Sequence, residues 1–210
     1  MNDLEKLVID RLLNLKVFKR QSVSPFLWAN GWKSPIYCDD KKILSYPKER
    51  DFFKLEISRV LMENFPDADV VAAVATNAIA QGVLVAEQLN LPFVYIYPKP
   101  KNHGLENQIE GDVKPGQKVV VLENQVNLGV HAMQAVEALR MSGCKVLGVL
   151  TILDYEIPSA KALFKKAGVP LVAMAHFSNL AKETIAQGQL TEPEYEEIKK
   201  WHSNPAAYKK

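Results

Sequence analysis

Residues 118–143, KVVVLENQVNLGVHAMQAVEALRMSG, decide the fold of this 210-residue chain. Residues 119–122 are apolar and mostly β-branched, which is typical of a strand buried on both faces of a parallel sheet. Residues 132–141 have helix-forming composition and an apolar stripe at helical spacing. The short loop between them carries Gly129. A strand, a loop and a helix N-terminus in this order predict a phosphate cradle, because free backbone N–H groups and the helix dipole point at the anion.

The same alternation of strand and helix patterns runs through most of the chain. Alternation of this kind favours right-handed βαβ connections and a central parallel sheet flanked by helices, which is an α/β fold. Residues 102–116 are polar and without periodicity, so they predict a loop or a β-flap. Predicted strands are residues 70–75, 93–97, 119–122, 146–153 and 169–173, and predicted helices lie near 78–88, 132–141, 160–167, 180–187 and 192–200.

Composition places the chain among ordinary globular proteins, with 48% hydrophobic and 24% charged residues. A formal net charge of +2 is too small to argue for binding to nucleic acid or to a membrane surface. Cys38 and Cys144 lie outside any metal-ligand spacing and are expected to be reduced thiols. The first 20 residues lack a signal-peptide layout, and no apolar run is long enough to span a bilayer. We therefore expect a cytoplasmic protein with no metal site of its own.

Four segments resemble a known enzyme family. Residues 118–131 resemble the phosphoribosyl-pyrophosphate (PRPP) motif of the type I phosphoribosyltransferases, in which four apolar residues precede two acidic residues and a Thr-Gly-Gly-Ser-like loop. The other three narrow the resemblance to the orotate phosphoribosyltransferases. They are WANGWKSPIYCD at 28–39, similar to the N-terminal segment, VATNAIA at 74–80, similar to the pyrophosphate loop, and KPKNHG at 99–104 with NQIEG at 107–111, similar to the mobile catalytic loop.

The resemblance covers about residues 26–158, in order and at the right spacing. It implies one domain over residues 1–210, with a small N-terminal hood at roughly 20–45 and a core at roughly 65–175. It also implies transfer of ribose 5-phosphate from PRPP to N1 of orotate, which yields orotidine 5′-monophosphate and pyrophosphate in pyrimidine nucleotide biosynthesis. Any Mg²⁺ would arrive with PRPP, because the chain offers few carboxylates at the site.

The resemblance also assigns site residues. In the family, the equivalents of Lys101 and His103 reach across a homodimer interface to stabilise charge on pyrophosphate, so a homodimer is implied. Each assignment also has a reading without function. Glu123 would then be an acidic residue left at the end of a strand, and Lys101 and His103 would be solvated loop residues. The lysine and the half-buried tyrosine of the hood would be ordinary surface residues, and so would the histidine at 131. The implied PRPP contacts are Glu123, Asn124, Asn127, Gly129, His131, Thr76, Asn77 and Lys99, and the implied orotate-side contacts are Lys33 and Tyr37.

The chain departs from the family pattern on these motifs. Leu128 replaces a threonine whose hydroxyl donates to phosphate, and Tyr97 replaces an arginine, whose bidentate bonding no tyrosine reproduces. Val130 stands where we expect a positive φ or a close approach to phosphate. Losing three hydrogen bonds to charged groups would cost roughly 4–9 kcal/mol if they added, or about three to six decades in affinity. The remaining departures are Asn124 for aspartate, His131 for serine, Asn77 for glycine, Asn30 for serine and Lys41 for arginine.

Three hypotheses follow from matches and departures together. In the first, the chain is a slow orotate phosphoribosyltransferase in which His131 and Lys41 partly compensate. In the second, it is a non-catalytic protein that binds a pyrimidine or a phosphate and acts as a sensor or as a regulatory partner. In the third, it is a dimeric structural partner without a ligand. The departures predict impaired or lost PRPP turnover. They also predict that residues 126–131 stay ordered but poorly shaped for phosphate, either by extending the helix N-terminus or by folding apolar side chains inward.

Overall fold

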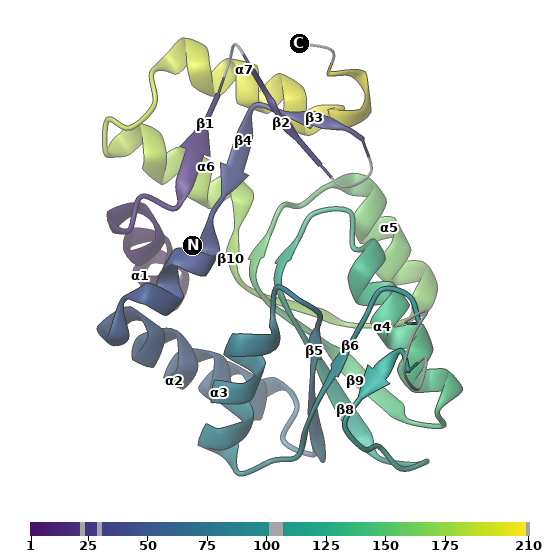
Figure 1. The fold of residues 1–210 in the computed structure, drawn as a ribbon. Coiled ribbons are helices and arrows are strands. Elements are labelled where there is room, and N and C mark those ends of the chain that lie inside the picture. The colour runs from purple at the N-terminus through teal and green to yellow at the C-terminus, as the bar shows by residue number, and fades with distance from the viewer. Residues whose placement is uncertain (22–23, 29–30, 101–106, 209–210) are drawn as a thin grey trace. The chain divides into compact units, whose positions relative to one another are not determined.

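A computed structural model describes residues 1–21, 24–28, 31–100 and 107–208 of the chain (Figure 1). These residues form two compact units. We call Met1–Ser45 with Ala175–Lys210 the terminal unit, and Tyr46–Met174 the sheet unit. No helix among the described residues is long and apolar enough to cross a membrane.

One six-stranded sheet, in the order β10-β9-β8-β5-β6-β7, organises the fold. Pairing is parallel from β9 through β8 and β5 to β6, and the short β7 is antiparallel to β6. The strands are β5 (Val70–Val74), β6 (Phe93–Ile96), β7 (Ile109–Glu110), β8 (Lys118–Val126), β9 (Lys145–Asp154) and β10 (Leu171–His176). Every residue of β5 is buried, as expected for a central strand covered on both faces. The predicted α/β class and mostly parallel central sheet are confirmed.

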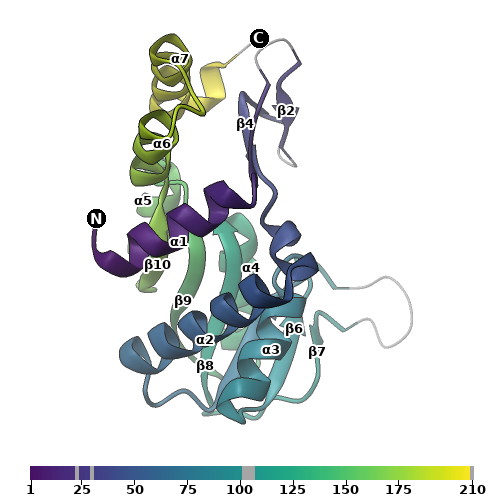
Figure 2. The same cartoon turned by 90° about the vertical axis from the view of Figure 1, so that its left-hand side faces the viewer.

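Helices cover both faces of this sheet. On one face α2 (Pro47–Asn64) and α3 (Ile79–Leu89) pack against each other, as Figure 2 shows, and on the other α4 (Val130–Met141) packs against α5 (Pro158–Ala167). Gly82 lets α3 approach the sheet closely, because a Cβ there would stand 2.6 Å from the ring of Phe93. The carboxyl ends of β5 and β8 lead into α3 and α4.

The terminal unit combines both ends of the chain. Its hairpins pair β1 with β4 and β2 with β3, and α1 packs against α6. Trp201 in α7 donates its indole N–H to the carbonyl of Lys33 over 3.1 Å, so the C-terminal helix packs on the N-terminal hairpins. Its elements are α1 (Asp3–Asn14), β1 (Phe18–Arg20), β2 (Phe26–Leu27), β3 (Lys33–Ser34), β4 (Ile36–Cys38), η1 (Asp40–Ser45), α6 (Phe177–Ala186), α7 (Glu192–Ser203) and η2 (Pro205–Ala207).

The largest difference from the predicted elements lies in β8. The sequence predicted a strand over residues 119–122, but β8 continues through the polar residues Glu123, Asn124 and Gln125 to Val126. It does so because β9 runs beside it to the end, where Gln125 and Val126 pair with Leu153 and Asp154. Since α4 also begins two residues earlier than predicted, the connecting loop contains only residues 127–129.

Candidate active site

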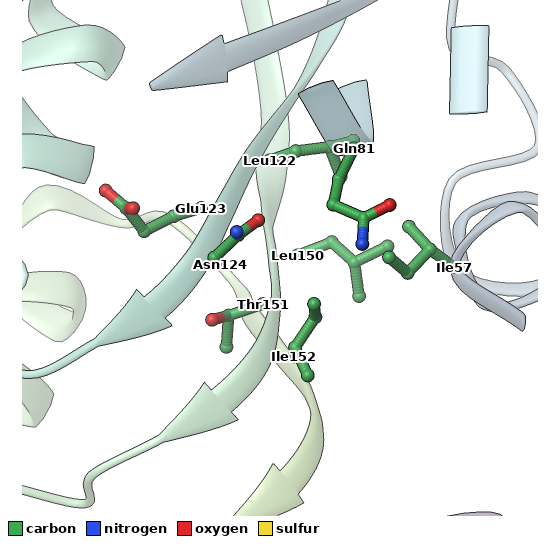
Figure 3. A pocket seen from close by; sticks show the side chains of 8 residues that line it. All are labelled: Ile57, Gln81, Leu122, Glu123, Asn124, Leu150, Thr151 and Ile152. Carbon is green, nitrogen blue, oxygen red and sulfur yellow. The ribbon is translucent and has the colours of Figure 1, made fainter. Parts of the chain in front are cut away.

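Two predicted contact residues, Glu123 and Asn124, lie in the last part of β8. Each is 6% exposed. Because successive side chains of a strand point to opposite faces, the two residues separate. Figure 3 shows Glu123 projecting to the same side as Thr151, its register partner on β9, while Leu150 and Ile152 project to the side of α2 and α3.

Asn124 connects β8 to the loop that follows β5. Its Nδ2 donates to the carbonyl oxygen of Asn77 over 3.0 Å. The 75–78 loop contains Thr76 and Asn77, both exposed, and the peptide bond between Ala75 and Thr76 is cis. The structure therefore brings three predicted contact residues, Thr76, Asn77 and Asn124, to one edge of the sheet. An ionised aspartate at 124 would lack the N–H that makes this bond.

The 127–129 loop has its special backbone conformation at Gly129, not at Val130. Gly129 has a φ of +72°, and a Cβ there would stand 2.8 Å from the ring of Phe164. Val130 is the first residue of α4, and it is not among the described non-glycine residues with positive φ, which are Lys16, Asn90 and Glu156. The expectation of a positive φ at Val130 was therefore wrong, and the residue extends the helix N-terminus as the first alternative predicted.

A side chain already occupies one backbone donor of this loop. The N–H of Leu128 donates to Oδ1 of Asn127 over 2.6 Å. Asn127 and Leu128 are half-buried, whereas Val130 is 47% exposed and His131 is exposed on the first turn of α4. The predicted cradle thus has a retained glycine and a helix N-terminus, but its Leu128 amide points at a neighbouring amide oxygen.

The predicted catalytic loop lies partly outside the described residues. Lys101 and His103 both belong to residues 101–106, which are not described, and Lys99 is exposed just before them. Tyr97, in place of arginine, exchanges hydrogen bonds with Gln108: its N–H donates to the Gln108 carbonyl over 2.9 Å, and its carbonyl accepts from Nε2 over 3.2 Å. Its ring also packs edge-on against Tyr95 at 5.8 Å between centroids. Tyr97 therefore anchors the base of the β6–β7 hairpin.

The predicted orotate-side residues belong to the terminal unit. We call residues 26–28 and 31–38 the hood segment. Lys33 is exposed on β3, and Tyr37 is 38% exposed on β4 with its ring 5.5 Å from that of Phe26. Lys41, considered above as a compensating cation, is exposed in η1.

A small cavity beneath the end of β8 contains residues that the sequence did not single out. It has a volume of about 10 Å³, which is room for roughly one water molecule. Gln81 projects into it from α3 (Figure 3), is 2% exposed, and its Oε1 has no hydrogen-bond partner among the described residues. The sequence signal that could have identified Gln81 is a polar residue within an apolar helix face. Thr151, a polar residue within the apolar run of β9, gives the same kind of signal. The lining is Ile57, Gln81, Leu122, Glu123, Asn124, Leu150, Thr151 and Ile152.

Comparison with known proteins identifies close relatives over the full chain, although no family model matches. A protein named orotate phosphoribosyltransferase from Phocaeicola vulgatus is 48% identical over 206 residues, which is 98% of this chain and 97% of that protein. One of the same name from Porphyromonas gingivalis is 44% identical over 208 residues, 99% of each chain.

Solved structures show the same fold at lower identity. The orotate phosphoribosyltransferase of Aeropyrum pernix superposes with a TM-score of 0.72 at 23% identity, over 84% of this chain and 98% of that one. The UMP synthase of Leishmania donovani gives 0.79 at 22% identity, over 93% of this chain and 41% of that one. The fold is that of the type I phosphoribosyltransferases.

Proposed function

We propose a function from one established premise: the chain belongs to the orotate phosphoribosyltransferase family, a family of pyrimidine biosynthesis. The family reaction transfers ribose 5-phosphate from PRPP to N1 of orotate, with pyrophosphate as the leaving group. We propose that this chain retains the fold of that enzyme and part of its ligand site, but that PRPP-dependent transfer is strongly impaired.

The occupied amide in the 127–129 loop is the observation that carries this proposal. The Leu128 N–H donates to Asn127 Oδ1 over 2.6 Å, so a phosphate oxygen would have to displace a bond that is already made. Leu128 itself has no hydroxyl to donate in exchange. A side chain that satisfies the loop from within takes the place of the anion.

The chemistry of transfer makes such losses costly. This reaction depends on positioning and on stabilising charge at the ribosyl centre and the leaving pyrophosphate, because no single nucleophile dominates it. By resemblance, Glu123 would accept from a ribose hydroxyl, while Lys101 and His103 would neutralise charge on pyrophosphate. Tyr97, whose backbone and ring hold the β6–β7 hairpin, supplies no cation in place of the family's arginine.

We propose that Mg²⁺, where it acts, enters with PRPP. The described residues contain no group of three side chains able to hold a metal ion, and Glu123 is the carboxylate among the predicted PRPP contacts. This donor set fits Mg²⁺ bound mainly through substrate oxygens and water. The ion would neutralise pyrophosphate charge, and Glu123 would orient the ribose.

A second candidate function is non-catalytic binding of a pyrimidine or a phosphate. The hood segment that resembles the orotate side keeps Lys33, Ser34 and Tyr37, so the departures are concentrated on the PRPP side. A chain that lost PRPP affinity but kept orotate affinity would serve as a pyrimidine sensor or as a regulatory partner of an intact enzyme.

Isothermal titration of the unmodified chain separates these functions. With PRPP and Mg²⁺ we expect affinity lower by about three to six decades than in the Phocaeicola vulgatus relative, which serves as the control. Orotate alone then distinguishes a sensor, which binds it, from a structural partner, which does not. PRPP affinity equal to that of the relative would overturn the proposal.

We also propose that the chain is a homodimer. The loop that contains Lys101 and His103 belongs, by resemblance, to a site completed by the neighbouring subunit. Sedimentation at micromolar concentration should give the mass of a dimer, about twice the 23.5 kDa of the chain. A monomer under those conditions would contradict the proposal.

A further inference from the structure

We propose that Asn124 is a positioning residue, which holds the 75–78 loop through its side-chain N–H donor. The role is distinct from the ribose contact that resemblance assigns to this position, and it does not depend on whether PRPP is turned over. The proposal rests on the bond from Nδ2 of Asn124 to the carbonyl oxygen of Asn77, at 3.0 Å.

The loop is held by backbone bonds on both sides of this contact. Ala75 N–H donates to the Ile96 carbonyl over 2.8 Å, and Ala78 N–H donates to the Val74 carbonyl over 3.0 Å. Asn77 lies between these anchors and is exposed. The bond from Asn124 is therefore the side-chain link that ties the loop to the end of β8, a strand 47 residues later in the chain.

The chemical identity of residue 124 decides whether this link forms. An asparagine donates two hydrogens, whereas an ionised aspartate only accepts. A carboxylate at this place would face a carbonyl oxygen across hydrogen-bond distance, inside a site where Asn124 is 6% exposed. A buried carboxylate that faces a carbonyl oxygen is disfavoured, so the carboxyl would remain protonated to a higher pH than usual.

None of the described residues that line the cavity beside Asn124 is a cation. The side chains that line the cavity beside Asn124 are Ile57 from α2, Gln81 from α3, Leu122 and Glu123 from β8, and Leu150, Thr151 and Ile152 from β9. Glu123 is the one titratable group among these lining residues, and it projects from the opposite face of β8 (Figure 3). Where Glu123 is ionised, its charge would also raise the pKa of an aspartate at 124.

Two asparagines of the motif provide a matched pair for the test. Asn124 acts as a donor to Asn77, while Asn127 acts as an acceptor from Leu128. An aspartate at 127 keeps its acceptor, whereas an aspartate at 124 loses the donor. Asn124→Asp and Asn127→Asp therefore add the same charge to the same motif, but only Asn124→Asp loses a hydrogen bond.

The experiment is urea unfolding of the unmodified chain and both variants from pH 5 to pH 9. At pH 8 we expect Asn124→Asp to raise the unfolding equilibrium constant about ten- to hundredfold. Because the pKa of the folded variant's carboxyl lies above the unfolded value of about 3.9, this deficit is smallest at the acid end of the range and grows as pH rises through the folded pKa. Asn127→Asp should remain close to the unmodified chain across the range. Equal pH profiles for the two variants would overturn the proposal.

A second variant covers the case in which Asn124→Asp does not fold at pH 8. Asn124→Leu removes the donor without adding charge, so its loss of stability should not depend on pH. Hydrogen exchange should then quicken at the amides of Ala78 and Ile79 and remain unchanged in the terminal unit. Unchanged exchange at those amides in Asn124→Leu would show that the loop is held without Asn124.

Discussion

The hood segment and the carboxyl end of β8 both resemble the family, but they differ in what their residues contact. In the hood segment the residues that match the family pattern make internal contacts. Ser34 donates its hydroxyl to the Ile36 carbonyl over 2.7 Å and accepts from the Ile36 N–H over 3.2 Å. Trp28 meets Trp201 edge-on at 5.5 Å.

At the end of β8 the departures fall on side chains that the resemblance assigns to PRPP contacts. Asn124 and Asn127 make internal hydrogen bonds there, the first as a donor to Asn77 and the second as an acceptor from Leu128. The exception is Gly129, which is retained and is required by its own φ and by Phe164. The hood segment thus keeps its packing residues together with Lys33 and Tyr37, whereas at the end of β8 Glu123 and Gly129 are kept and the other predicted PRPP contacts differ from the family pattern. From this contrast we expect the fold to be kept where PRPP binding is weakened.

The largest expected effect on stability is at Trp201. This residue is 1% exposed, donates to Lys33 and packs against Trp28 and Phe177. Trp201→Ala should lower the free energy of unfolding by about 3–5 kcal/mol, measured by urea denaturation. Trp201→Phe keeps an aromatic ring and loses the N–H, so it should cost less. If Trp201→Ala left the free energy of unfolding unchanged, the terminal unit would not depend on this contact. The packing role given to the hood segment would then be wrong.

A smaller effect is expected at Gly129. Gly129→Ala introduces a Cβ at a φ of +72° and within 2.8 Å of Phe164, which should cost about 2–4 kcal/mol. Gly168 is the matched control, since its φ is +62° but nothing lies within 4 Å of an added Cβ. Gly168→Ala should cost only about 1–2 kcal/mol. Equal changes in melting temperature for the two variants would show that the ring of Phe164 moves aside without a loss of stability.

The smallest effect is a pH dependence in the terminal unit. Burial alone would raise the pKa of Glu5, but hydrogen bonds from Asn179 and from the side chain and backbone of His176, with the charge of His176, hold it below its ordinary value. A depressed folded pKa gives stability that is present above the unfolded pKa and lost as pH falls through the folded one. Glu5→Gln should remove this part of the acid dependence of unfolding. If the stability of Glu5→Gln fell with acid pH as it does in the unmodified chain, other carboxyls would be responsible for that dependence.

Much of the fold was predictable because its strands are long apolar runs between turn signals. Strands β5, β6 and β9 and helices α3 and α5 lie within about two residues of their predicted bounds. The polar end of β8 was not predictable from its own residues, since its pairing with β9 determines it. The hood strands contain two or three residues each, too few to give a periodic pattern.

The candidate site was predictable only as a set of residues. Resemblance located Glu123, Asn124 and Gly129, but not the bond between Asn124 and Asn77, because that bond joins positions that only the folded sheet brings together. At Val130 the sequence predicted a positive φ or a close approach to phosphate, whereas the helix begins there and the positive φ lies at Gly129. Gln81 had no chemical motif, and only its burial beneath β8 makes it notable.

The decisive measurement is orotate-dependent release of pyrophosphate from PRPP. We expect the unmodified chain to give a rate that is undetectable or several decades below that of the Phocaeicola vulgatus relative under the same conditions. Joint restoration by Asn77→Gly, Tyr97→Arg, Asn124→Asp, Leu128→Thr, Val130→Gly and His131→Ser should recover PRPP binding before it recovers rate, because these positions act on one transition state. Turnover of the unmodified chain near the roughly 10 s⁻¹ typical of enzymes would contradict the account.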